Sequence, residues 1–92
     1  MTADRWELST SARLKAVGDT EALYVGEQRA LHVLNPTARI LLHCLDRPST
    51  LAELVAMMAR LTDATEARLE GDLGEILPEL ERLGAVRRVL AE

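Results

Sequence analysis

The residues of this 92-residue chain best suited to metal chemistry are His32, His43 and Cys44. The two histidines lie on different predicted elements, and Cys44 is the only cysteine. Zinc sites use closely spaced pairs such as C-x-x-C or H-x-x-x-H, and the sequence contains neither spacing. We therefore expect a structural or surface role for each histidine, a buried thiol at Cys44, no metal site and no cofactor.

Two carboxylates could do acid and base chemistry. Asp72 and Glu75 are three residues apart on a predicted helix, so they can share one face. A chain this short has no second domain to bury them in a cleft and shift their pKa values, so a solvated acidic face is the simpler interpretation. No serine or threonine has the context of a nucleophile elbow, and Gly71 and Gly74 lie in a helical pattern rather than a phosphate loop. The sequence predicts no catalytic residue, and we expect the protein not to be an enzyme.

Three short strands are predicted before the first helix. Residues 12–17 alternate small or apolar side chains with basic ones. This two-residue period is typical of a strand with one face exposed to solvent. Residues 21–25 contain a tyrosine and a valine, which favour strands. Residues 29–34 follow a turn predicted at residues 26–28. Because the connections are short, we expect an antiparallel meander.

Two capped helices are predicted next. Asn35 and Pro36 suit the N-cap and the first position of a helix that continues through residue 46. Thr50 and Glu53 have the spacing of a capping box, which opens a second amphipathic helix.

A third helix is predicted between Thr65, which can cap it, and Gly84, which can end it. Pro78 lies inside this helix and predicts a kink near Gly74. The apolar residues step by four, three, four and three along one face, which we expect to be buried: Leu69, Leu73, Ile76, Leu80 and Leu83.

The predicted order of three strands followed by three helices indicates an α+β fold of winged-helix type, with a three-stranded antiparallel sheet. The chain has room for one hydrophobic core, so we expect a single domain over residues 1–92 with its core at about 12–88. The only aromatic residues are Trp6 and Tyr24, which predicts an aliphatic core. Residues 85–90 predict a short terminal strand or an extended tail.

The net charge of −4 belongs to one segment. Residues 65–84 carry six acids and two bases, whereas the rest of the chain has equal numbers of both. A winged-helix domain that reads DNA would place this helix in the major groove, where phosphates require lysine and arginine. We therefore expect no nucleic-acid partner.

No stretch of the chain reaches the roughly 20 apolar residues of a membrane span. The N-terminus has no apolar segment of signal-peptide length, and a single cysteine allows no intrachain disulfide. We therefore expect a cytoplasmic protein with no membrane partner.

Four short motifs mark the predicted elements: Leu34-Asn35-Pro36, Pro48-Ser49-Thr50-Leu51-x-x-Leu54, Leu69-Glu70-x-Asp72-Leu73 and Leu80-x-x-x-Gly84-x-Val86. With them the chain resembles the PqqD family, the small peptide chaperones of pyrroloquinoline quinone biosynthesis and related pathways. The domain is also called the RiPP recognition element, for ribosomally made and post-translationally modified peptides. The resemblance covers about residues 13–86.

Members of this family have three antiparallel strands followed by three helices, and they bind the leader segment of a precursor peptide. The resemblance implies that the leader adds as a strand to the third strand, in a groove whose other wall is the third helix. It also implies that the peptide is presented to a modifying enzyme such as a radical enzyme, a protease or a cyclase. The peptide-binding residues expected on this basis are Arg29, Ala30, Leu31, His32, Val33, Leu69, Asp72, Leu73 and Ile76.

Physical chemistry supports this mode, because an edge strand offers unpaired amides and carbonyls to an extended peptide. Asp72 and the acids beside it are expected either to pair with a basic leader residue or to keep the chain soluble. Two other functions stay open: a winged-helix DNA-binding regulator, and an interaction domain that forms a homodimer by pairing its third strand with a copy of itself.

Overall fold

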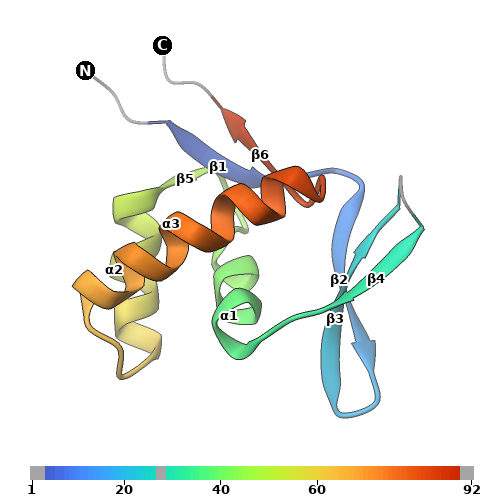
Figure 1. The fold of residues 1–92 in the computed structure, drawn as a ribbon, viewed down its shortest axis with the longest axis horizontal. Coiled ribbons are helices and arrows are strands. Elements are labelled where there is room, and N and C mark those ends of the chain that lie inside the picture. Colours follow the sequence, from blue (N-terminus) through green and yellow to red (C-terminus); the bar gives the residue numbers. More distant parts are fainter. Residues whose placement is uncertain (1–3, 27–28, 90–92) are drawn as a thin grey trace.

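The computed structural model describes residues 4–26 and 29–89. In these residues three helices and six strands follow one another in the order shown in Figure 1. They are β1 Arg5–Leu8, β2 Ala12–Val17, β3 Thr20–Val25, β4 Ala30–Val33, α1 Pro36–Cys44, β5 Ser49–Thr50, α2 Leu51–Leu61, α3 Glu66–Arg82 and β6 Val86–Val89. The predicted α+β class is confirmed, and the predicted strands and helices correspond to β2, β3, β4 and α1, α2, α3.

The sheet formed by β2, β3 and β4 is the predicted antiparallel meander. Its order is β2-β3-β4, so β2 and β4 are its edges. Gly18, whose φ is 61°, makes the tight turn between β2 and β3. The predicted second turn includes residues 27 and 28, which lie outside the described residues. Arg29, which the sequence places in the third strand, has a φ of 51°, so β4 begins one residue later at Ala30.

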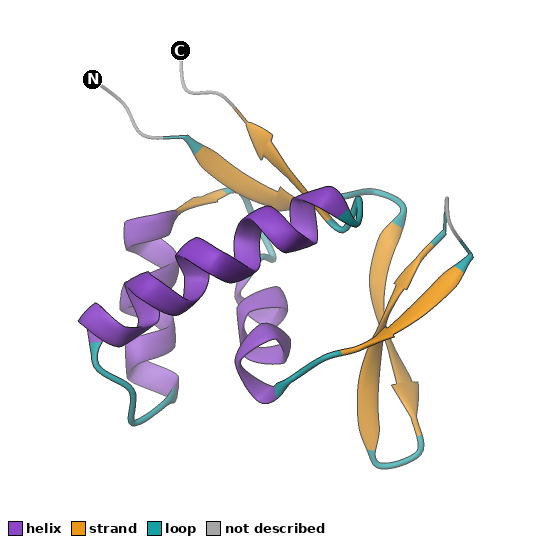
Figure 2. Cartoon of the chain, viewed as in Figure 1, coloured by secondary structure: helices purple, strands orange, loops and turns teal. Residues whose placement is uncertain are grey.

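A second sheet, in the order β5-β1-β6, joins the two ends of the described chain (Figure 2). β1 pairs with β6 over four positions, beginning with Arg5 opposite Val89. β6 corresponds to the predicted terminal strand, whereas the sequence predicts no strand at β1. Trp6 on β1 is buried, and the guanidinium of Arg88 lies 4.7 Å from the centre of its ring. The N-terminal segment is therefore part of the fold.

The predicted caps of α1 and α2 are confirmed. Asn35 accepts a hydrogen bond from the amide of Ala38 at 2.8 Å, so α1 starts directly after β4. At α2 the Thr50 hydroxyl accepts from the Glu53 amide, and the Glu53 carboxylate accepts from the Thr50 amide, which completes the capping box. The strand that forms the sheet edge and the helix that follows it are therefore held at a fixed junction.

α3 packs against α2 and passes in front of α1 in Figure 1. Thr65 caps its start and Gly84, whose φ is 80°, ends it, as predicted. The helix runs without a break through Pro78. Pro78 and Gly74 are both exposed, so water can reach the carbonyl that the proline leaves unpaired. The buried side chains of α3 form a stripe of Leu69, Leu73, Leu77 and Leu80.

The core is largely aliphatic, as predicted, and Trp6 is the aromatic side chain that it includes. Full burial of one such side chain contributes about 1.5–3 kcal/mol. The side chains that drive folding come from β3, from all three helices and from the segment before β6, so the helices and the meander share one core. The core residues with no exposed surface are Leu23, Val25, Leu41, Leu54, Met58, Leu73 and Ala85.

Replacing Asn35 with alanine removes the acceptor that caps α1. We expect the free energy of unfolding to fall by about 1 kcal/mol, since N-cap losses typically cost about 0.5–2 kcal/mol. The Asn35→Asp variant keeps a capping oxygen and should retain most of the wild-type stability. Urea unfolding followed by circular dichroism measures both variants, and an equal loss in the aspartate variant would contradict capping as the cause.

The capping box at α2 should weaken in acid. Hydrogen bonds from the Thr50 amide and then the Thr50 side chain lower the pKa of Glu53 below its ordinary value of 4.5. The ionised carboxylate therefore stabilises the fold above pH 4.5, and this contribution is lost as the pH falls through the folded-state pKa. The difference in thermal midpoint between wild type and Glu53→Ala should shrink between about pH 7 and about pH 3. A difference that stays constant would show that the carboxylate charge is not involved.

Candidate functional site

The free edge of β4 lies beside a groove. No strand pairs with the far side of β4 in the described residues. The groove has a volume of about 490 Å³, and we call it the β4–α3 groove. Asn35 and Ala38 at the start of α1 close one side of it. Its strand wall is formed by Leu31, His32 and Val33 of β4 and by Leu34 just after it, and its helical wall by Glu75, Ile76, Glu79, Leu80 and Leu83.

The groove continues past the C-terminal end of β4 into an adjoining hollow of about 230 Å³. Glu75 and Ile76 line both spaces, so the two are neighbours along α3. Asp72 and Thr37 line the adjoining hollow but not the groove. An extended chain beside β4 would therefore meet Glu75 before it reached Asp72.

Five of the nine predicted peptide-binding residues come together at this site. Leu31, His32, Val33 and Ile76 line the β4–α3 groove, and Asp72 lines the adjoining hollow. These residues come from a strand and a helix that are far apart in the sequence, and the fold places them on two facing walls.

The other four predicted residues do not line the groove. Arg29 is exposed immediately before β4, and Ala30 is half-buried on the strand itself. Leu69 and Leu73 are 2% and 0% exposed and pack in the core, and Leu69 borders a separate hollow of about 270 Å³ that Asp72 also lines. The predicted role of Arg29 and Ala30 concerns their backbone. Ala30 lies on the edge strand, whereas the positive φ of Arg29 takes it out of the extended strand.

Four residues on the helical wall of the groove were missing from the prediction: Glu75, Glu79, Leu80 and Leu83. For Glu79, Leu80 and Leu83 the available signal was their spacing from Ile76, because residues three, four and seven positions along a helix lie on the same side. Glu75 has the corresponding spacing from Asp72 and Glu79, three and four residues away. The predicted apolar stripe contained Ile76 and Leu83 but not Leu77, and it was therefore centred slightly to one side of the true buried stripe.

The side chains of β4 alternate between two faces of the sheet. His32 lies opposite the fully buried Leu23, so His32 and Ala30 point toward the helices. Leu31 and Val33 point to the outer face, where they are 55% and 95% exposed. Val33 therefore contributes almost no burial to the fold, and its side chain is available to a partner.

The α3 wall of the groove is acidic. No lysine or arginine lines the groove or the adjoining hollow. Asp72 lies 3.8 Å from Arg68, and Glu79 pairs with Arg82, but both pairs are solvent-exposed and such pairs contribute little. Glu75, between them, makes no ion pair within the described part of the chain.

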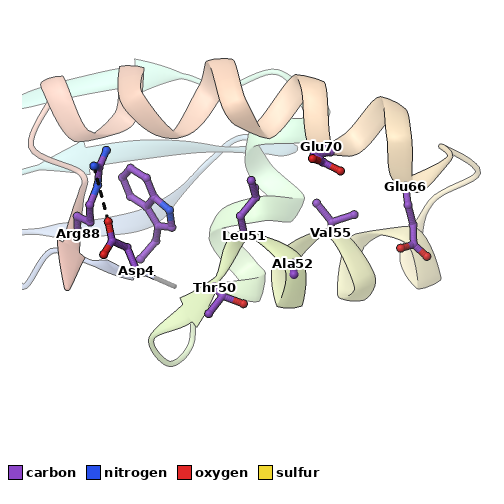
Figure 3. Close-up of a pocket in the computed structure, with 9 residues that line it drawn as sticks. Asp4, Thr50, Leu51, Ala52, Val55, Glu66, Glu70 and Arg88 are labelled. Atoms are coloured by element: carbon purple, nitrogen blue, oxygen red, sulfur yellow. Dashed lines mark ion pairs between the residues drawn. The ribbon is translucent and has the colours of Figure 1, made fainter. Parts of the chain in front are cut away.

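A larger pocket of about 580 Å³ lies on the other flank of α3 (Figure 3). There the guanidinium of Arg88 covers the Trp6 ring and lies 3.9 Å from Asp4 and 3.6 Å from Glu81. These two carboxylates are therefore paired with a cation of the chain itself. The bordering strand β1 is paired on both sides, by β5 and β6. β6, which contributes Arg88 to this pocket, is an edge of that sheet, but Arg88 already covers Trp6 and pairs with acids of the chain. We therefore take the β4–α3 groove, which has no lysine or arginine on its walls, as the candidate site for an extended peptide. The remaining residues of the larger pocket are Thr50, Leu51, Ala52, Val55, Glu66 and Glu70.

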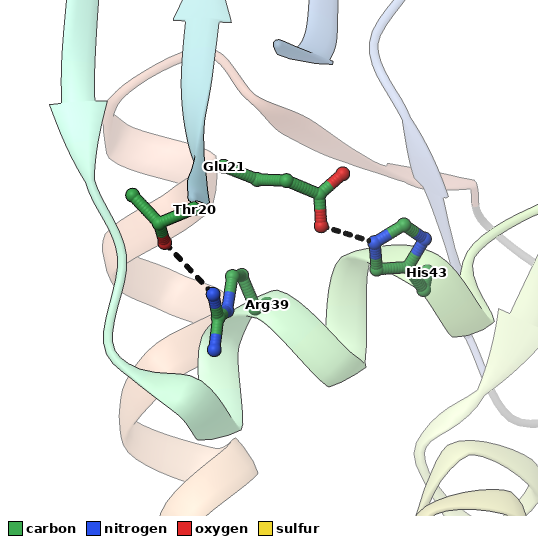
Figure 4. A network of polar contacts seen from close by, with 4 residues as sticks. All are labelled: Thr20, Glu21, Arg39 and His43. Atoms are coloured by element: carbon green, nitrogen blue, oxygen red, sulfur yellow. Dashed lines mark hydrogen bonds and ion pairs between the residues drawn. The ribbon is translucent and has the colours of Figure 1, made fainter. Parts of the chain in front are cut away.

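Two polar contacts hold the β2–β3 hairpin against α1 (Figure 4). Arg39 donates a hydrogen bond to the Thr20 hydroxyl at 2.8 Å, and Nε2 of His43 lies 2.7 Å from a carboxylate oxygen of Glu21. Cys44, the next residue, is buried, and this burial raises the pKa of its thiol. A thiol with a raised pKa is a poor nucleophile and a poor metal ligand. Among the described residues no three metal-binding side chains cluster.

The family model described as coenzyme PQQ synthesis protein D (PqqD) matches residues 22–86 of the chain. The match begins in β3 and ends at the start of β6, so it includes both walls of the β4–α3 groove. No curated protein and no solved structure matches the chain. None of the helices in residues 4–26 and 29–89 combines the length and the apolar character that crossing a membrane requires.

The ring of His32 has a buried nitrogen whose effect on stability can be tested. Its Nε2 atom is enclosed in the groove wall and has no hydrogen-bond partner among the described residues. Such an atom costs about 1–3 kcal/mol, so His32→Leu should raise the free energy of unfolding by about 1 kcal/mol. Urea unfolding at neutral pH measures the change, with His43→Leu as the control that removes a satisfied histidine. An unchanged or lower stability of His32→Leu would show that the atom finds a partner in solution.

Proposed function

The chain belongs to the PqqD family, and we propose that it binds the leader segment of a ribosomally synthesised precursor peptide by adding it as a strand to β4. The observation that carries this proposal is the free edge of β4 beside the β4–α3 groove. Extended peptides bind in this way when a sheet edge supplies main-chain partners and adjacent pockets receive alternate side chains.

The edge of β4 can supply the main-chain part of the binding. Along an edge strand, alternate amides and carbonyls point away from the sheet and need partners. Each hydrogen bond to an incoming strand contributes about 0.5–1.5 kcal/mol net. β4 has only four residues. The main-chain bonds alone therefore give modest affinity, and side chains must provide the rest.

Side chains on both faces of β4 can provide this additional affinity. The added strand would place alternate side chains over Ile76, Leu80 and Leu83 on the helical side of the sheet. The side chains between them would lie beside Leu31 and Val33 on the outer face, and would cover apolar surface that is now exposed to water.

We propose a non-catalytic role, in which the chain holds the leader and presents the precursor to a modifying enzyme such as a radical enzyme, a protease or a cyclase. Holding an extended peptide requires backbone groups, apolar walls and a few charges, all of which the groove has. The chain would hold the leader, and the enzyme would carry out the chemistry.

The two alternative functions predict different partners for the same elements. As a DNA reader, α3 would bring mainly acidic exposed side chains to the phosphates, which repel them. As a homodimer, the chain would pair β4 with its copy, and the dimer would occupy the edge that a peptide needs. Light scattering without peptide identifies the dimer, and titration with duplex DNA identifies the regulator.

If the peptide adds as a strand, the contribution of its backbone amides to binding should alternate from one residue to the next. We expect a synthetic peptide covering the leader of the precursor encoded beside this chain to bind with a micromolar or lower Kd, measured by fluorescence anisotropy. Methylating single backbone amides of the peptide should weaken binding at least about tenfold at every second position within the bound segment, because only alternate amides face β4.

Hydrogen exchange of the protein locates the edge that is used. Amides of β4 should become protected when the peptide binds, whereas amides of β2, the other edge of the same sheet, should not. Binding without any alternation in the methylation scan, or protection at β2 in place of β4, would contradict the proposed geometry. If no precursor leader encoded beside this chain binds, the proposed function is wrong.

A further inference from the structure

The β4–α3 groove has a marked chemical asymmetry between its two walls. The strand wall is formed by Leu31, His32, Val33 and Leu34 and carries no carboxylate. The helical wall contains Glu75 and Glu79, and Asp72 follows in the adjoining hollow. An incoming peptide would therefore pass between an apolar edge and a row of acids.

The row of acids follows from the geometry of α3. Asp72, Glu75 and Glu79 are three and four residues apart, so they lie along one flank of the helix. The buried leucines occupy the neighbouring stripe and face the core. Since this stripe fixes the rotation of α3 about its axis, the acids cannot turn away from β4 while the core stays packed.

Glu75 has the central position in this row. It lines both the groove and the adjoining hollow, and it makes no ion pair within the described residues. On the opposite flank of α3 the situation differs, because Arg88 lies 3.6 Å from Glu81 and 3.9 Å from Asp4. Arg88 thus supplies a cation to Asp4 in the larger pocket, whereas no lysine or arginine lines the groove around Glu75.

A peptide added to β4 would displace water from around Glu75. Removing water from a carboxylate that gains no partner is costly, whereas a cation placed beside it recovers the lost solvation. Apolar side chains are favoured further along, over Ile76, Leu80 and Leu83. A leader that brings an acid to Glu75 would be repelled.

We propose that the groove selects leader segments by charge: the segment that adds to β4 carries a lysine or arginine opposite Glu75 and aliphatic residues over Ile76, Leu80 and Leu83. This inference rests on the proposed leader binding and names the class of leader that the site accepts. Electrostatic complementarity of this kind contributes mainly to selectivity and to the rate of association. Asp72 extends the acidic surface beyond the end of β4 and attracts a second basic residue.

A displayed library of random 12-residue peptides tests the inference without knowledge of the natural precursor. Peptides selected on the wild-type chain should be enriched in lysine and arginine at one position relative to their aliphatic residues. Selection on the Glu75→Lys variant should lose this enrichment and favour aspartate or glutamate at that position. The matched control is Glu70→Lys, which makes the same charge change on the opposite flank of the same helix.

A selected basic peptide then serves as the probe for affinity. Its Kd should rise about tenfold or more on Glu75→Lys and by much less on Glu70→Lys, and a peptide with its basic residue changed to glutamate should recover binding to Glu75→Lys. Both substituted positions are exposed and lysine favours helix, so the variants should fold, which circular dichroism checks.

The outcomes separate the inference from the function on which it rests. Selected peptides that protect β4 but show no charge preference would overturn the inference and leave leader binding intact. Equal effects of Glu75→Lys and Glu70→Lys would also overturn it, since the net charge of the chain and not the groove would then be responsible. A library that yields no binder to the β4 edge would count against the proposed function as well.

Discussion

The burial of four leucines on α3 is the constraint on which the rest of the structure depends. Leu69, Leu73, Leu77 and Leu80 are each at most 4% exposed, and they are the buried side chains that α3 contributes to the core. Their burial determines how α3 is rotated about its axis. One flank then faces β4 and forms the groove, and the other flank faces α2 and forms the larger pocket. The position of the site is thus a consequence of core packing.

Local features of the fold could be predicted from the sequence, because each depends on residues a few positions apart. The caps at Asn35, Thr50 and Thr65 and the strands of the meander are of this kind. The pairing of β1 with β6 could not be predicted in the same way. It joins segments from opposite ends of the chain, and no local pattern in Arg5–Leu8 identifies its partner.

The candidate site was predictable to a smaller extent, for a geometric reason. A helix with leucines at 69, 73, 77, 80 and 83 and an isoleucine at 76 has an apolar surface wider than the stripe that the core can cover. Periodicity shows that such a surface exists but does not show which edge of it stays accessible. Leu69 and Leu73 were consequently assigned to the groove, whereas the structure places Ile76, Leu80 and Leu83 there and buries the first two. Only the tertiary position of β4 distinguishes the two edges.

The ends of β4 limit the length of any strand that pairs with it. Arg29 has a left-handed backbone conformation, which breaks the extended geometry at one end. At the other end Asn35 turns the chain into α1, and Pro36 has no amide hydrogen to donate. A partner chain can therefore pair in register with only the four residues between these two breaks and cannot slide along a longer edge. The same limits make β4 a poor template for open-ended stacking of strands, so a free and partly apolar edge can persist in the unbound protein with a reduced tendency to aggregate.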